Sequence, residues 1–205
     1  GTPRFASSNH EARGKKSDGN WHTHLQGIAQ SARLRTHLSR TASPKPEDIL
    51  PEMDDDIAAF LAINQECEAQ LWPATESELR AMIGNAYRAV LTPDRDGMLI
   101  AFDERAPYDS PNFRWFAERY PRFVYVDRVA VTERARGRGL ARRLYEDLIA
   151  AARADGHRVV CAEVYFEPPN PQSDAFHEVM GFVEVGRARV ADRGGKTVRY
   201  LVREL

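Results

Sequence analysis

A glycine-rich basic segment between an apolar run and a helical run is the feature that most constrains the fold of this chain. The segment Arg134-Ala-Arg-Gly-Arg-Gly-Leu-Ala141 follows the mostly apolar run 123–131 and precedes the helical run 140–154. A strand that ends in a glycine turn and opens a helix leaves backbone N–H groups unpaired where the helix dipole is positive. Such an arrangement binds phosphate groups, so the segment predicts a phosphate-binding turn. The alternative interpretation is a basic turn exposed to solvent.

Three phosphate-binding patterns compete for this chain. A P-loop would use Gly195-Lys-Thr, but Val190 occupies the position of its first glycine and a strand pattern follows, so a hairpin turn is the better interpretation. A dinucleotide fingerprint would need a third glycine where the chain has Arg142. The pattern that remains is Arg/Gln-x-x-Gly-x-Gly/Ala. It is matched by Arg134, Gly137 and Gly139, and again by Arg136, Gly139 and Ala141.

Length and charge divide the chain into two parts. With 205 residues, of which 42% are hydrophobic, it can bury one sizeable core, and one main domain is expected. Residues 1–45 hold eight Lys or Arg and two Asp or Glu, which gives this part a charge of about +6 and the remainder about −7. We expect 1–45 to be a basic, disordered leader or an added extension, with a transit peptide as an alternative, and 46–205 to be the folded domain. The acidic body argues against nucleic-acid binding.

The cysteine content and the lengths of the apolar runs indicate a compartment. The two cysteines, Cys67 and Cys161, are too few for a disulfide framework and lack the spacing of a metal site. No apolar run approaches the roughly 20 residues that span a bilayer. We therefore expect a soluble, cytoplasmic protein without a metal or a membrane partner.

Hydrophobic periodicity predicts alternating helices and strands beyond Pro46. Thr75 is the expected N-cap of one helix, with Glu78 completing a capping box. Helices are predicted over 54–63, 76–87, 113–119, 140–154 and 171–180, and strands over 88–91, 98–102, 122–131, 158–166, 182–190 and 197–203. Paired strands on either side of a strand-helix-strand-helix unit indicate an α+β or α/β three-layer design, with a mixed sheet flanked by helices.

A second motif follows in the segment Asn170-Pro-Gln-Ser173, continued by Phe176-His177 and Gly181-Phe182. Together with the glycine turn and the order of elements, it resembles the GNAT superfamily of acyl-CoA-dependent N-acyltransferases over about residues 47–205. The resemblance implies a central mixed, mostly antiparallel sheet with a splayed strand pair. It also implies acetyl-CoA as cosubstrate, and it identifies no subfamily.

The resemblance assigns the cofactor to the turn and the strand before it. Backbone N–H groups of the turn would face the pyrophosphate, nearby arginines would approach the phosphates, and the pantetheine arm would pair like an extra strand, next to a bulge that opens the slot. Asn170 and Ser173 would hydrogen-bond this arm or the helix start, and Asn170 could instead be a structural N-cap. The expected cofactor-binding residues are Val129, Ala130, Val131, Arg136, Gly137, Arg138, Gly139, Leu140, Ala141, Arg142, Asn170, Ser173 and Phe176.

Glu163 and His177 are the expected catalytic residues. Glu163 interrupts the apolar run 159–166, where a carboxylate is costly unless it is paired or used, and it matches the base of some relatives. The alternative is a structural ion pair with an arginine such as Arg128. His177 stands where the superfamily commonly has a tyrosine that protonates the leaving thiolate, and the alternative is a helix histidine that packs against the cofactor. Cys161 could carry an acyl group, or be a buried inert thiol.

The acceptor residues are expected mainly in the aromatic segment 108–120. Asp109, Arg114 and Trp115 of this segment, together with Asp127, are predicted to recognise the amine. Alternatively, the aromatic residues of this segment belong to the core.

The expected function is transfer of an acetyl group from acetyl-CoA to a primary amine of a small or amino-acid-like acceptor by direct attack. The alternatives are an acyl-CoA-binding regulatory module without turnover and a protein or peptide N-acetyltransferase. A strand over 197–203 at a sheet edge could pair across a homodimer.

Overall fold

The computed structural model describes residues 46–205 apart from 168 and 191–194, and the expected leader 1–45 lies outside the described residues. The helices are α2 (Pro46–Glu66), α3 (Glu76–Asn85), α4 (Pro111–Ala117), α5 (Leu140–Ala154) and α6 (Pro171–Val179), with a 3₁₀ turn η1 (Glu133–Ala135). The strands are β1 (Arg88–Leu91), β2 (Gly97–Asp103), β3 (Phe123–Val131), β4 (Val159–Glu167), β5 (Val183–Val190) and β6 (Lys196–Glu204).

The elements predicted from periodicity are confirmed, with shifts at their ends. Helix α2 begins at Pro46, earlier than the predicted 54, and α4 begins at Pro111 because proline suits the first turn of a helix. The capping box is present. The Thr75 N–H donates to Glu78 Oε2 at 2.7 Å, and the Glu78 N–H donates to Thr75 Oγ1 at 3.3 Å.

The six strands form one mixed, mostly antiparallel sheet in the order β1-β2-β3-β4-β6-β5. The only parallel pair among the described strands is β3 with β4, and its register runs from Phe123↔Val159 to Val126↔Ala162. Ile100 pairs with Arg128 while Ala101 pairs with Val126, so Asp127 is an extra residue of β3. This bulge lies where β3 and β4 separate, as bulges that bend a strand do. The expected splayed pair is therefore confirmed.

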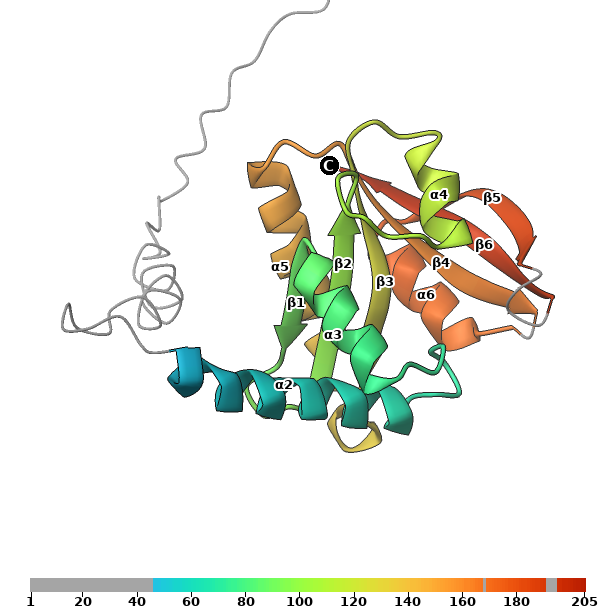
Figure 1. Cartoon of the computed structure of the whole chain (residues 1–205). Coiled ribbons are helices and arrows are strands. Elements are labelled where there is room, and N and C mark those ends of the chain that lie inside the picture. Colours follow the sequence, from blue (N-terminus) through green and yellow to red (C-terminus); the bar gives the residue numbers. More distant parts are fainter. Residues whose placement is uncertain (1–45, 168, 191–194) are drawn as a thin grey trace, which may run out of the picture. The chain divides into compact units, whose positions relative to one another are not determined.

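The sheet separates two hydrophobic cores. Residues of α2, α3 and α4, such as Phe60, Leu79 and Phe116, pack on one face, whereas residues of α5 and α6, such as Tyr145 and Leu148, pack on the other. Figure 1 shows α2 and α3 in front of β1 and β2, with α5 behind them. Burial of each large apolar side chain contributes about 1.5–3 kcal/mol, so these cores hold the strand ends in place.

The prediction that the strand 197–203 lies at an edge of the sheet is wrong. This strand belongs to β6, which lies between β4 and β5 and is hydrogen-bonded on both sides. The last hairpin folds β5 outside β6, so β5 is an edge of the described sheet and β6 has no free side for a second copy. The prediction of a homodimer therefore loses the strand on which it rested.

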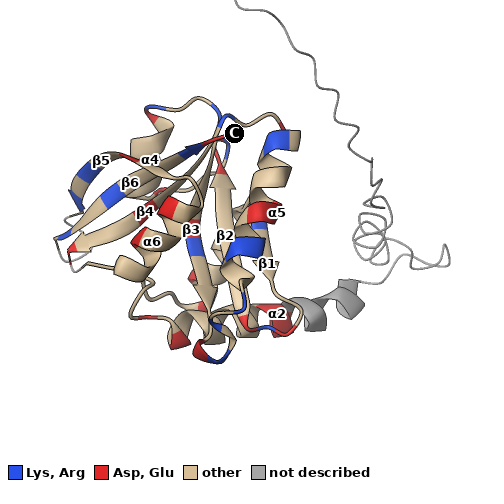
Figure 2. Cartoon of the chain, turned by 180° about the vertical axis from the view of Figure 1, so that it is seen from behind, with Lys and Arg blue, Asp and Glu red and all other residues tan. Residues whose placement is uncertain are grey.

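Basic and acidic residues are interspersed along the described part of the chain. Seen from behind, both signs occur along the strands and α5 (Figure 2). Helix α5 carries Arg142 and Glu146 within 3.9 Å of each other, four residues apart on one face. In the part of the chain that the structure describes, we find no helix with the length and apolar character that crossing a bilayer requires.

Candidate functional site

A cavity of about 400 Å³ opens where β3 and β4 separate. One part is formed by the glycine turn, the end of β3 and the start of α6. The other part is formed by the α2–α3 connection and the middle of β4. Its lining includes 15 of the sequence-predicted site residues, namely Asp127, Val129, Ala130, Val131, Arg136, Gly137, Gly139, Leu140, Ala141, Arg142, Glu163, Asn170, Ser173, Phe176 and His177. Residues distant in the sequence are thus brought to one place.

Two glycines give the turn its shape. Gly137 and Gly139 have φ values of +75° and +73°, in the left-handed region that side chains with a Cβ disfavour. A Cβ built at either position would have no other atom within 4 Å. Glycine is therefore required by the backbone conformation and not by steric crowding. Gly139 caps α5 without a side-chain hydrogen bond, so the first N–H groups of the helix have no capping side chain, and the residues Gly139, Leu140 and Ala141 line the cavity.

The turn is anchored from outside the cavity. The Glu133 N–H donates to Glu66 Oε1 of α2 at 2.8 Å, and an Arg143 guanidinium N–H donates to the Arg138 carbonyl at 3.2 Å. Arg138 is one of the predicted cofactor residues, but it is not part of the cavity lining. The arginines that line the cavity beside the turn are Arg136 and Arg142.

His177 is buried and hydrogen-bonded on both ring nitrogens. Its Nδ1 lies 2.8 Å from the Ser173 carbonyl oxygen, which can only accept, so Nδ1 carries the proton. Nε2 of the neutral ring then accepts from the Tyr145 hydroxyl at 2.9 Å. Burial lowers the pKa of His177 from the ordinary histidine value, with a smaller opposing effect of the Ser173 carbonyl. This geometry favours the interpretation of His177 as a helix histidine over that of an acid.

Glu163 lies half-buried in the cavity wall. Its Oε1 accepts a hydrogen bond from Asn112 Nδ2 at 2.9 Å. The pKa of the adjacent Tyr125 hydroxyl is held well above its usual range, mainly by burial and further by the negative charges of Glu163 and Asp127. The carboxylate therefore faces the cavity from a polar network within the core. The structural alternative for Glu163 is an ion pair with Arg128, but the contacts shown for Arg128 are with other residues.

Arg128 instead ties the α2–α3 connection to β3. One of its guanidinium N–H groups donates to Asn64 Oδ1 at 2.5 Å and to the Trp72 carbonyl at 2.6 Å. Its Nε lies 3.3 Å from Asp127 Oδ2. Asp127 also accepts from the Tyr108 hydroxyl at 2.7 Å, so the carboxylate at the bulge is held from two sides.

The outer rim of the cavity is aromatic. Trp72 and Tyr165 both line it, and the Lys196 ammonium lies 5.9 Å from the Trp72 ring centroid and 4.5 Å from that of Tyr165. Aromatic faces attract cations, and here Lys196 of the chain itself supplies the cation.

Three predicted acceptor residues lie outside the cavity lining. Asp109 and Arg114 form an exposed ion pair at 2.8 Å. Trp115 stacks on Tyr200 at 4.2 Å between ring centroids, and a Cβ at Gly186 of β5 would lie 2.7 Å from its ring. Trp115 thus packs against the sheet, in agreement with the alternative that the aromatic residues of this segment are core.

Cys161 is buried on β4, and burial raises the pKa of its thiol well above the usual value. A thiol in this state is a poor nucleophile, which favours the inert alternative over an acyl-cysteine.

Several residues of the site carried no signal in the sequence. Asn112 hydrogen-bonds Glu163, Tyr145 hydrogen-bonds His177, and Arg128 holds the α2–α3 connection. None of these three residues belongs to a local motif. Asn112 is fully buried directly after the proline of α4, and a polar residue among aromatic ones was the one available hint.

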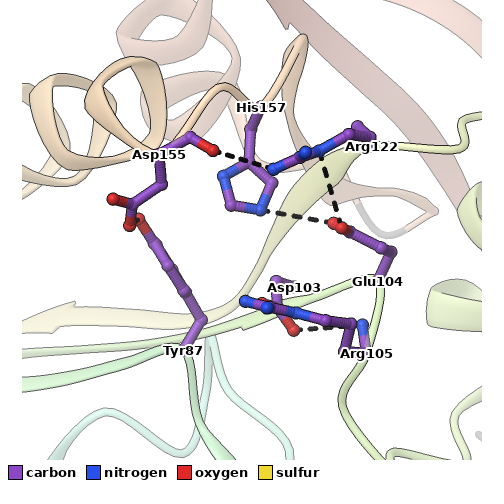
Figure 3. A network of polar contacts seen from close by, with 7 residues as sticks. All are labelled: Tyr87, Asp103, Glu104, Arg105, Arg122, Asp155 and His157. Atoms are coloured by element: carbon purple, nitrogen blue, oxygen red, sulfur yellow. Dashed lines mark hydrogen bonds and ion pairs between the residues drawn. The ribbon is translucent and has the colours of Figure 1, made fainter.

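A second polar cluster lies at the end of the sheet where β4 begins (Figure 3). The side-chain ligand atoms of Asp103, Glu104 and His157 lie within 4.8 Å of one another, close enough to hold a cation. However, Arg105 contacts Asp103, and Arg122 lies 3.7 Å from Glu104, so both carboxylates already face a positive charge. We interpret the cluster as a structural network that joins the end of β2 to the starts of β3 and β4.

Comparisons with known proteins agree with this fold. The family model described as the acetyltransferase (GNAT) family matches residues 50–182. A comparison with curated proteins gives no significant match.

Solved structures share the fold at low sequence identity. The ribosomal-protein-S18-alanine N-acetyltransferase from Escherichia coli is 18% identical, with a TM-score of 0.52 over 80% of this chain and 91% of its own. The ribosomal-protein-alanine N-acetyltransferase from Brucella melitensis is 23% identical, with a TM-score of 0.55 over 74% and 95%. An N-acetyltransferase from Staphylococcus aureus Mu50 is 20% identical, with a TM-score of 0.51 over 73% and 93%.

Proposed function

The chain belongs to the GNAT acetyltransferase family, and we propose that it transfers an acetyl group from acetyl-CoA to a primary amine of a small or amino-acid-like acceptor by direct attack. The observation that carries this proposal is the continuity of the cavity. The cavity extends from the glycine turn at Gly137 and Gly139, which has the form of a phosphate-binding turn, to the half-buried carboxylate of Glu163. It lies where β3 and β4 separate.

The residues on the cofactor side suit acetyl-CoA. The start of α5 offers unpaired N–H groups and a positive dipole to phosphate, and Arg136 and Arg142 line the same wall. Beyond Val126, β3 no longer pairs with β4, so the main chain around Val129 and Val131 can pair with an extended arm. Acetyl-CoA, when bound, supplies a thioester carbonyl and a thiol leaving group.

On the acceptor side, we propose Glu163 as the residue that accepts a proton. An ammonium must lose a proton before its nitrogen can attack a carbonyl carbon, and general-base catalysis of this kind contributes about 10²–10⁴-fold. The carboxylates of Glu163 and Asp127 and the rings of Trp72 and Tyr165 all line this cavity. Together they favour a positively charged amine. His177, with Nδ1 as donor to Ser173, would orient the start of α6.

The test is release of free thiol from acetyl-CoA with a panel of amines, amino acids, polyamines and short peptides. Glu163→Gln is measured beside the parent, together with acetyl-CoA affinity by calorimetry. Turnover with a small amine that is lost in Glu163→Gln supports the proposal. Turnover with peptides alone would replace it by the peptide N-acetyltransferase. Tight acetyl-CoA binding without turnover on any acceptor would replace it by the regulatory module.

A further inference from the structure

Asn112 connects helix α4 to the carboxylate of Glu163 in the cavity wall. It is fully buried, and its Nδ2 donates to Glu163 Oε1 at 2.9 Å. Its Oδ1 accepts from the Tyr200 hydroxyl at 3.0 Å, within the buried core. One amide thus connects the carboxylate of β4 with a tyrosine of β6.

The Tyr200 hydroxyl fixes the orientation of this amide. The NH₂ and carbonyl ends of an asparagine amide exchange places when it turns over by 180°. The ionised carboxylate of Glu163 can only accept, so the NH₂ end is directed at it, and the Tyr200 hydroxyl, which donates to Oδ1, holds the amide in this orientation. Trp115, one turn further along α4, stacks on the Tyr200 ring at 4.2 Å and limits its movement.

A donor at this position has a chemical consequence for Glu163. An amide N–H bonds a charged carboxylate more strongly than a neutral carboxylic acid, and it therefore favours the ionised form. The same bond limits rotation of the carboxylate, which lines the cavity. Misplacement of a reacting group by about 1 Å can cost about 10²-fold in rate.

We infer that Asn112 is a positioning residue for Glu163, holding the carboxylate ionised and oriented toward the acceptor amine, with Tyr200 fixing the orientation of Asn112. The inference rests on the proposed function in that it takes Glu163 as the base. Asn112 itself does not touch the acceptor, and it acts through Glu163 alone.

The first experiment measures kcat/KM for the acceptor against pH in the parent and in Asn112→Ala. Loss of the donor favours the protonated carboxyl, so we expect the acidic limb to move to higher pH by about one unit and kcat/KM near neutrality to fall about tenfold. Acetyl-CoA affinity should stay within about twofold. Glu118→Gln, at the exposed end of the same helix, is the matched control and should leave the limb in place.

A uniform loss of rate at every pH, with the limb unmoved, would overturn the inference and leave Asn112 a merely structural residue. If Asn112→Ala does not fold, Tyr200→Phe provides the second variant, because it removes only the hydroxyl that orients the amide. It should move the limb in the same direction by a smaller amount, and an unmoved limb there contradicts the inference.

A second experiment needs no turnover and separates this inference from the proposed function. The carboxyl carbon of Glu163 is titrated by ¹³C NMR in the full chain and identified by its absence in Glu163→Gln. A higher titration midpoint in Asn112→Ala or Tyr200→Phe supports the positioning role even if no acceptor is acetylated. Equal midpoints in the parent and in both variants would refute it even if the parent is an active acetyltransferase.

Discussion

The two ends of the cavity are built in different ways. The end at the start of α5 presents main-chain groups, held in place by two glycines of positive φ within one short turn. The end at Glu163 presents side chains from β3, β4 and the α2–α3 connection, and Asn112 of α4 supports Glu163 from the buried core. A site made of main chain is specified by a local segment, whereas a site made of side chains is specified by the topology that brings distant segments together.

The strongest way to separate the two ends is Glu163→Gln. This change keeps the size of the side chain and removes its capacity to accept a proton, so kcat should fall about 10²–10⁴-fold. Acetyl-CoA affinity, measured by calorimetry, should stay near the parent value because the turn is untouched. A variant that retains a third of the parent rate would show that the base lies elsewhere, with Asp127 as the next candidate.

The converse change is Gly139→Ala, at the main-chain end. A Cβ in the left-handed conformation costs about 1–2 kcal/mol, so acetyl-CoA should bind about tenfold more weakly while the KM of the acceptor stays the same. Gly84→Ala is the matched control. It also has open space around its Cβ, but it lies in α3 at a negative φ, where alanine stabilises a helix. Equal affinities in the parent and Gly139→Ala would mean that the turn does not hold the cofactor.

His177 lies between the two ends and provides a pH test. Burial lowers its pKa, so the unfolded chain takes up a proton at a higher pH than the folded chain does. The free energy of unfolding should therefore fall as the pH drops below about 6.5, the ordinary value for histidine, and His177→Gln should flatten this dependence. Chemical denaturation at several pH values measures it. If His177 were the acid, the variant would also abolish turnover, whereas a structural histidine leaves kcat within about tenfold of the parent value.

The smallest effect is expected for Arg114→Ala. The exposed pair with Asp109 lies outside the cavity lining, and exposed ion pairs contribute little to stability. We expect the KM of the acceptor to change by less than about twofold. A tenfold rise in that KM would restore Arg114 to the acceptor site, as the sequence prediction had it.

The difference between the two ends also explains which features could be predicted from the sequence. The glycine turn, the capping box at Thr75 and the bounds of α5 follow from neighbouring residues. The Asn112–Glu163 contact joins residues 51 positions apart, and the Asn112–Tyr200 contact joins residues 88 apart. Pattern and spacing contain no information on such pairs until the sheet order is known.

The same limit accounts for the error in the sheet edge. Two consecutive strands after α6 predict a hairpin, but either member of a hairpin can be the outer one. In the sheet, β6 pairs with β4, and Tyr200 lies opposite Glu163. Strand β5 is therefore the outermost strand on this side. Which strand is outer depends on these long-range contacts.

Gly186 of the outer strand β5 lies against the ring of Trp115. Because of this contact, a mutation in β5 can affect the chemistry of the site. Any side chain at position 186 would displace the indole ring that supports Tyr200, and through Tyr200 and Asn112 the disturbance would reach Glu163. Homologous sequences that change position 186 should therefore change position 115 as well. If such paired substitutions occur, they would show that the residues supporting the Glu163 carboxylate extend to the edge strand β5.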